Sequence, residues 1–276
     1  SLPRFLIEEI ERSTRALALE LGVVGLMNVQ FAIAEESVYV LEVNPRASRT
    51  VPFVSKAIGV PIAQLAARVM AGKSLLELGF TREVVPSHVS VKEAVFPFVK
   101  FPAVDTLLGP EMKSTGEVMG IDREFGRAYA KAQRGAGMDL PIRGTVLVSL
   151  RDEDKASGAG ALRVLQEEGF SLVATAGTAA YMRERGLDVQ PIHKVREGAP
   201  HTESLISSGE VSLVIATTRM GDASAVRDSA SMRRAALEAG IPYFTTVAGA
   251  RAAASAIRAL RAGEVQPIAL QDLHTV

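Results

Sequence analysis

The sequence predicts an α/β protein of two parts: an α+β part with an antiparallel hairpin, followed by a doubly wound five-stranded parallel sheet. Its 276 residues are long for one average domain. A hairpin pattern stands in the first half, and in the second half short apolar strands alternate with helical stretches. Residues 135–144 between them are rich in glycine and poor in apolar side chains. We therefore expect domains at 1–134 and 145–276, joined by a linker at 135–144.

The first half begins with a helical pattern and continues with a hairpin. Apolar residues at helical spacing predict a helix over 6–21, ended by Gly22. Strands are predicted over 24–34 and 37–44 around the polar pair Glu35 and Glu36, and Pro45 stops the second strand. A mostly helical stretch runs to Gly72, followed by a strand over 89–98 and a loop over 108–116.

The second half alternates strands and helices, which is typical of a doubly wound parallel sheet. The predicted strands are 145–150, 170–175, 189–193, 211–217 and 243–247. The predicted helices are 160–168, 178–185, 202–208, 225–239 and 250–262.

Composition excludes several classes of function. Lys plus Arg equals Asp plus Glu, 31 against 31, so no global positive field attracts nucleic acid. The absence of cysteine excludes disulfides, thiolate metal sites and a cysteine nucleophile, and fits a reducing compartment. No signal peptide or membrane span is visible. We expect a cytoplasmic protein that binds neither DNA nor membranes. Because the chain starts at Ser1 and runs straight into a helical pattern, we also expect it to be cut from something longer.

Polar side chains converge on one face of the predicted hairpin. A strand period of two puts Asn28 and Gln30 on one face, and Glu42 and Asn44 on one face of the returning strand. If the turn is centred on Glu36, Gln30 lies opposite Glu42 and Asn28 opposite Asn44. The other face, directed to a core, would carry Met27, Val29, Phe31, Tyr39, Leu41 and Val43. Carboxylate and amide oxygens suit a hard cation such as Mg²⁺, although strand parity alone favours a solvated face whose polar residues pair across the strands.

Two arginines, Arg46 and Arg49, follow these polar residues. Their planar, always charged groups match carboxylate and phosphate oxygens, as an acyl-phosphate intermediate would require. Two loop arginines taken alone are more often surface residues.

The stretches GLMNVQF (25–31), EVNPR (42–46) and RTVPFVSK (49–56) together resemble the second ATP-grasp unit of the carbamoyl-phosphate synthetase large subunit. The resemblance implies that Gln30, Glu42 and Asn44 hold Mg²⁺ or Mn²⁺ around ATP, with K⁺ as a further ion and with Gln30 and Glu42 on the ATP side. It implies that Arg46 and Arg49 are the catalytic pair that steadies the phosphorylated intermediate.

Two later stretches, SVKE (90–93) and LGPEMKSTGEVMG (108–120), also resemble that family. In members that respond to ornithine, the residue that matches Glu93 helps to bind it. An ordinary strand carboxylate paired with a nearby lysine explains Glu93 equally well.

Candidate anion-binding residues gather at strand ends in the second half. Ala174-Thr-Ala-Gly-Thr178 lies where a strand turns into a helix, so backbone N–H groups and hydroxyls can face a phosphate, although a simple N-cap role explains Thr178 equally well. Lys155, Lys194 and the pair Thr217 and Thr218 follow other strands. Ligands of open α/β sheets bind at these carboxyl ends.

This second half resembles the methylglyoxal-synthase-like domain that ends the same family's large subunit, where nucleotides such as UMP or IMP bind. The resemblance implies phosphate and ribose contacts from Lys155, Thr175, Thr178, Lys194, Thr217 and Thr218, and a contact of Thr245 with ornithine. Ala216 and Ala248 replace asparagines of enterobacterial-type members, and residues 219–222 form a stretch two residues longer, so the effector's identity stays open. The histidines His88, His193, His201 and His274 lack metal-binding spacing.

The resemblance covers nearly the whole chain in one order and implies part of a ligase. The family makes carbamoyl phosphate from bicarbonate, ATP and ammonia derived from glutamine, for pyrimidine and arginine biosynthesis. The resemblance also implies a glutaminase small subunit as partner, an oligomer, and phosphorylation of carbamate in this ATP-grasp unit. The residues that grip adenine and triphosphate have no counterpart here, so we expect the polypeptide alone to be inactive.

Three alternatives compete with this interpretation. One is a non-catalytic regulatory module that binds UMP or IMP. A second is methylglyoxal synthase activity, which would need a catalytic Asp and His that 174–178 does not offer. A third is a biotin-carboxylase-like ligase, which would share the Glu-x-Asn pattern but would leave the second domain unexplained.

Overall fold

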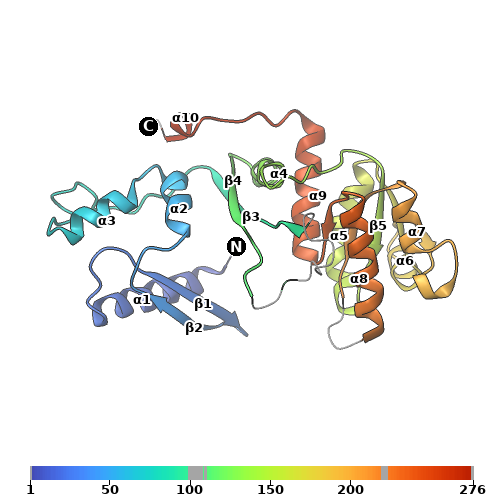
Figure 1. Cartoon of the computed structure of the whole chain (residues 1–276), viewed down its shortest axis with the longest axis horizontal. Helices are drawn as coiled ribbons and strands as arrows, with labels where there is room; N and C mark the ends of the chain where they lie inside the picture. Colours follow the sequence, from blue (N-terminus) through green and yellow to red (C-terminus); the bar gives the residue numbers. More distant parts are fainter. Residues whose placement is uncertain (1, 99–107, 109–110, 219–222, 275–276) are drawn as a thin grey trace. The chain divides into compact units, whose positions relative to one another are not determined.

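The computed structural model describes residues 2–98, 108, 111–218 and 223–274, and it divides into two compact units (Figure 1). Unit 1 comprises Ser1–Ser87 and Ala269–Val276, and unit 2 comprises His88–Ile268. The longer stretch predicted at 219–222 and part of the 108–120 motif lie outside the described residues.

Unit 1 contains one hairpin and four helices among its described residues. Helix α1 (Arg4–Glu20) precedes strands β1 (Asn28–Ala34) and β2 (Ser37–Asn44), and helices α2 (Thr50–Ile58), α3 (Ile62–Met70) and α10 (Leu270–His274) complete it. The helical stretch predicted to Gly72 is interrupted because Gly59 adopts φ +69° and ends α2. The unpredicted α10 lies against α2, where His274 Nε2 is 2.7 Å from the Lys56 carbonyl oxygen.

The hairpin pairs its polar residues as predicted, but for a different reason. Gln30 lies opposite Glu42 and Asn28 opposite Asn44. The turn is the pair Glu35 and Glu36, both with positive φ, so the turn alone would shift this register by one residue. A β-bulge at Leu41 removes that shift, because the register changes between Gln30 and Phe31.

The bulge also changes which side chains of β2 lie inside. Tyr39 and Leu41 are 54% and 65% exposed, so the prediction that they face a core is wrong. Val38 and Val43 are the partly buried valines of this strand. One extra residue reverses the alternation of faces on its far side, and a strict period of two cannot foresee it.

Unit 2 contains a five-stranded parallel sheet in the order β7-β6-β5-β8-β9. The strands are β5 (Thr145–Ser149), β6 (Ser171–Thr175), β7 (Val189–Ile192), β8 (Val211–Ala216) and β9 (Tyr243–Phe244). The helices between and after them are α5 (Asp152–Glu167), α6 (Ala176–Arg183), α7 (Thr202–Ser207), α8 (Ala223–Glu238) and α9 (Val247–Ala262). This is the predicted doubly wound sheet.

Both faces of this sheet are buried. Val146 and Val148 of β5 point into a core shared with α5, α6 and α9, whereas Leu147 points into a core shared with α7 and α8. All three side chains have no exposed surface. Strands buried on both faces form continuous apolar runs, which explains why the sequence predicted β5, β6 and β8, whereas the edge strand β7 exposes Gln190 and Pro191.

An antiparallel pair and a helix complete unit 2, and of these three elements the sequence predicted only the first strand. Strand β3 (Val89–Val95) pairs with β4 (Gly116–Asp122), and α4 (Phe125–Gly135) packs on β4 and α9. A Cβ atom on Gly126 of α4 would lie 2.6 Å from the Ser255 carbonyl oxygen of α9. The two helices therefore approach each other through a glycine.

The predicted linker 135–144 lies inside unit 2 in the structure. Its first glycines end α4, with Gly137 at φ +84°, and Leu140 is buried in the core that α5 and α9 share. The compact units instead meet between Ser87 and His88 in the sequence. The glycines predicted to separate domains are thus the end of a helix.

Among the described residues, no single helix is long and apolar enough to cross a membrane. Helices α2 and α3 together reach the required length and apolar composition, but the pair is bent by 112°.

Candidate functional site

A cavity of about 320 Å³ lies in unit 2 at the carboxyl edge of the parallel sheet. Its walls come from the residues that follow β5, β6, β7 and β8, and from α8. The chain leaves β5 towards β6 and β7 on one side and later places β8 and β9 on the other, so β5 and β8 flank the point where the winding reverses. Open α/β sheets bind ligands at this point.

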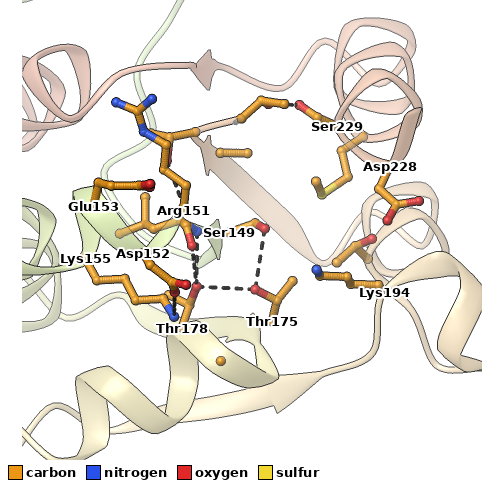
Figure 2. Close-up of a pocket in the computed structure, with 17 residues that line it drawn as sticks. Ser149, Arg151, Asp152, Glu153, Lys155, Thr175, Thr178, Lys194, Asp228 and Ser229 are labelled. Carbon is orange, nitrogen blue, oxygen red and sulfur yellow. Dashed lines mark hydrogen bonds and ion pairs between the residues drawn. The ribbon is translucent and has the colours of Figure 1, made fainter. Parts of the chain in front are cut away.

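The residues predicted to contact phosphate and ribose all line this one cavity. They are Lys155, Thr175, Thr178, Lys194, Thr217 and Thr218. Figure 2 shows Lys155 approaching from α5 and Lys194 from the segment after β7, on opposite sides of Thr175 and Thr178. The structure thus brings together side chains that stand far apart in the sequence.

Thr178 joins two elements of the cavity wall. Its hydroxyl accepts a hydrogen bond from the Leu150 N–H at 3.1 Å and donates to the Leu150 carbonyl at 3.3 Å. Thr175 donates to the same hydroxyl at 3.3 Å (Figure 2). The N-cap alternative for Thr178 is wrong, because α6 starts at Ala176 and its N-cap residue is Thr175. Thr178 therefore fixes the turn after β5 against α6.

Thr217, which follows β8, connects the end of that strand to the turn before α5. Its hydroxyl accepts the Arg151 N–H at 3.1 Å and interacts with the Asp154 carboxylate. The hydrogen bond from Arg151, 2.6 Å from Nε to Oδ2, is the main reason why the pKa of Asp154 is lowered, against the raising effect of burial. Thr218 donates to the Ser229 hydroxyl of α8. The turn after β5 is thus held from both neighbouring strands.

Several charged residues that the sequence analysis missed also line the cavity. They are Arg151, Asp152, Glu153 and Asp228. The Lys155 ammonium is 2.6 Å from Asp152 Oδ1, and the Lys155 side chain is only 11% exposed. Helix α5 was predicted to start at Gly160, eight residues late, so its acidic first turn was not recognised as following a strand end. The strand-end rule that located Lys155 also applies to this turn.

Glu93 and Thr245, predicted to bind ornithine, are not among the residues that line this cavity. Burial raises the pKa of Glu93, and a hydrogen bond with Gln133 opposes this effect. Burial and the charge of Glu93 raise the pKa of Tyr129. The alternative that Glu93 pairs with a nearby lysine is wrong for Lys92, whose ammonium lies 3.1 Å from Glu117 instead. Thr245 is exposed just after β9.

The predicted metal ligands of unit 1 lie together on the hairpin. Asn44 Nδ2 donates to Glu42 Oε1, and Gln30 is the cross-strand partner of Glu42. Arg46 reaches Asn44 Oδ1 at 3.4 Å, and Arg49 precedes the first residue of α2. This donor set fits a hard cation chemically, since it offers one carboxylate and amide oxygens at the surface. Within the described part of the chain, no three His, Cys, Asp or Glu side chains form a metal-binding group.

Comparison with known proteins identifies both halves. Residues 2–78 match the family model "Carbamoyl-phosphate synthase L chain, ATP binding domain", and residues 159–245 match the model "MGS-like domain". A solved methylglyoxal synthase from Elizabethkingia anophelis NUHP1 is 19% identical and covers 40% of this chain and 76% of that chain, with a TM-score of 0.30.

Curated relatives match almost the whole chain. The carbamoyl phosphate synthase large chain of Rhizobium meliloti is 56% identical over 97% of this chain, and that of Brucella suis is 54% identical over 97%. The protein of the same name from Pseudomonas putida is 54% identical over 99%. The matched region covers 24%, 23% and 25% of these relatives, so the chain spans about a quarter of their length. The chain belongs to the carbamoyl phosphate synthase large-chain family and contains part of its ATP-binding domain and its MGS-like domain.

Proposed function

We propose that the cavity of unit 2 binds a nucleoside monophosphate such as UMP or IMP and that this binding regulates a carbamoyl phosphate synthase. The observation that carries the proposal is the convergence of Lys155, Lys194 and four threonines on one cavity at the carboxyl edge of the sheet. Two ammonium groups, backbone N–H groups at the start of α6 and hydroxyls supply the donors that a phosphate monoester and a ribose need.

The charges of the cavity suit a small anion. Arg151, Lys155 and Lys194 stand against Asp152, Glu153 and Asp228, so the formal charges of these side chains cancel. A phosphate must therefore be bound locally, by Lys155 and the first turn of α6, and not by a field over the whole cavity. Such a site favours a monophosphate over a highly charged polyphosphate.

We propose that unit 1 forms part of the ATP-binding site of the enzyme. Gln30, Glu42 and Asn44 would hold Mg²⁺ or Mn²⁺, with K⁺ as a further ion, and the metal would neutralise phosphate charge when bound. Arg46 and Arg49 would orient and stabilise the phosphorylated intermediate through their guanidinium groups. Phosphoryl transfer depends mainly on such positioning and charge.

In the intact protein, these parts would serve the ATP-dependent formation of carbamoyl phosphate from bicarbonate and ammonia, with phosphorylation of carbamate in this unit. The proposal includes a glutaminase small subunit as the source of ammonia, an oligomeric and cytoplasmic enzyme, and a role in pyrimidine and arginine biosynthesis. Ornithine, held by Glu93 and Thr245, would be a second effector. The isolated chain would bind nucleotides without catalysing the reaction.

Calorimetric titration of the chain with UMP and IMP tests the cavity. Lys155→Met is expected to weaken binding by about tenfold or more, since a hydrogen bond to a charged group contributes about 1.5–3 kcal/mol. Lys73→Met is the control, because Lys73 is exposed in unit 1, 3.8 Å from Glu77. If neither nucleotide binds, or if both variants bind like the wild type, the proposed cavity function is wrong.

An ATPase assay on the same chain tests whether the isolated chain is catalytically inactive, as proposed. No bicarbonate-dependent ATP hydrolysis is expected, and measurable turnover would contradict the proposed inactivity of the chain. The methylglyoxal synthase alternative remains disfavoured, because no histidine is among the described residues that line the cavity.

A further inference from the structure

Lys155 occupies an unusual position for a cation. It lies in the first turn of α5, and its ammonium approaches the first turn of α6, where a Cβ atom on Gly177 would be 3.3 Å from Nζ. The start of a helix carries partial positive charge from its unpaired N–H groups. A largely buried ammonium beside this helix start therefore needs an anion nearby.

Asp152 supplies that anion in the structure. Its Oδ1 is 2.6 Å from Lys155 Nζ, as a neighbour three residues earlier on α5. The two partners differ in exposure: the Lys155 side chain is 11% exposed, whereas that of Asp152 is 88% exposed. Figure 2 shows the carboxylate lying against the ammonium beside Thr178. The Asp152 side chain is therefore accessible to solvent, whereas Lys155 lies in the cavity wall.

We infer that the Asp152 carboxylate is an internal competitor of the ligand's phosphate for Lys155. The inference rests on the proposed function of the cavity and adds a determinant of its affinity. A phosphate that binds Lys155 must share or displace the carboxylate, and a negative charge held at that ammonium repels a second anion at close range. Asp152 thus lowers the affinity of the cavity for anions and keeps Lys155 in place when no ligand is bound.

Glu153 offers a matched comparison within the same turn. It also lines the cavity and also belongs to the acidic first turn of α5, so its removal changes the net charge and the helix start in the same way. Its charge acts on Arg151. Asp152→Asn and Glu153→Gln therefore differ chiefly in whether the partner of Lys155 is neutralised.

The experiment is calorimetric titration of the 276-residue chain and its variants with UMP and, separately, with inorganic phosphate. Asp152→Asn is expected to bind both about fivefold more tightly than the wild type, equivalent to about 1 kcal/mol at 1.4 kcal/mol per tenfold. Glu153→Gln is expected to gain at most about twofold, because a more distant charge is screened by salt. Circular dichroism of each variant checks that the fold is kept.

A double-mutant cycle makes the assignment specific. In the Lys155→Met background, Asp152→Asn is expected to gain no more than Glu153→Gln does, because the competition is for Lys155. The inference is overturned if Asp152→Asn binds no more tightly than Glu153→Gln, or if its gain survives without Lys155. If the wild type binds UMP but these gains are missing, only the inference fails. If no variant binds either probe, the proposed function fails and the inference with it.

Discussion

Gly120→Ala is expected to destabilise unit 2 strongly, because strand β4 approaches helix α4 through this glycine. A Cβ atom at position 120 would overlap the Ala128 carbonyl oxygen and would lie 2.5 Å from the Ala132 nitrogen and 2.9 Å from the Ala132 Cβ atom. Two of these three atoms belong to the helix backbone, so no side-chain rotation relieves the overlap. The helix must move away from the strand.

The size of the effect follows from that movement. Ordinary contact needs about 3.4 Å or more, so α4 must retreat by roughly 1 Å, and forced overpacking of this kind costs about 1–3 kcal/mol or more. Ala128 and Ala132, both with no exposed surface, would lose part of their packing. We expect a loss of about 3 kcal/mol, which lowers the melting temperature by about 6–12 °C in a unit of this size.

Differential scanning calorimetry and urea unfolding measure this loss. Gly116→Ala is the matched control: it lies on the same strand, and a Cβ atom there meets nothing within 4 Å. That variant is expected to match the wild type or to be slightly more stable, since replacing Gly by Ala without strain reduces the conformational entropy of the unfolded chain. A Gly120→Ala protein that unfolds together with Gly116→Ala would refute the close packing of α4 on β4.

Three further predictions concern polar groups of unit 2. Thr178→Val leaves the Leu150 N–H and carbonyl without their hydroxyl partner, so it is expected to lower the free energy of unfolding by about 1–3 kcal/mol. Thr178→Ser keeps the hydroxyl and is expected to melt close to the wild type. Equal melting temperatures for the wild type and both variants would contradict this account. Burial raises the pKa of Asp122, but the hydrogen bond with Lys131 and the nearby positive charges outweigh this effect and lower the pKa overall. The ionised Asp122 therefore stabilises the fold fully above the unfolded pKa of about 4, and this stabilisation is lost as pH falls through the folded pKa. Asp122→Asn should therefore flatten the stability profile below about pH 4, and an unchanged profile would count against this role. For Glu93 the pKa is raised by burial, so its contribution is full below the unfolded value of about 4.3 and is lost as pH rises through the folded pKa; Glu93→Gln should be more stable than the wild type in urea at pH 7, and a less stable variant would contradict this account.

The sequence was sufficient for the parallel sheet but not for the elements packed around β4. The central strands β5, β6 and β8 are apolar runs because both faces of the sheet are buried there, and that signal is independent of neighbours. Helix α4 instead buries small residues, Gly126, Ala128 and Ala132, whose apolar signal is weak. Its packing depends on how closely two backbones approach each other, which spacing in the sequence does not encode.

The candidate site shows the same limits. The rule that ligands bind at strand carboxyl ends placed six residues on one cavity, whereas Asp152 was missed because helix α5 starts earlier than its apolar pattern. In unit 1 strand parity gave the correct partners for Gln30 and Glu42, although it could not detect the bulge at Leu41 that produces them. Whether these groups bind metal and nucleotide stays a prediction.

The bulge at Leu41 has a consequence for variation of the hairpin. The turn at Glu35 and Glu36 shifts the strand pairing by one residue, and the extra residue at Leu41 shifts it back. The pairs near the turn and the pairs at the polar end of the hairpin are therefore in registers that differ by one residue. A related chain can gain one residue in the turn and lose the bulge, or the reverse, while Gln30 still meets its partner Glu42. Selection can thus alter the tip of this hairpin without disturbing the pairing of its base.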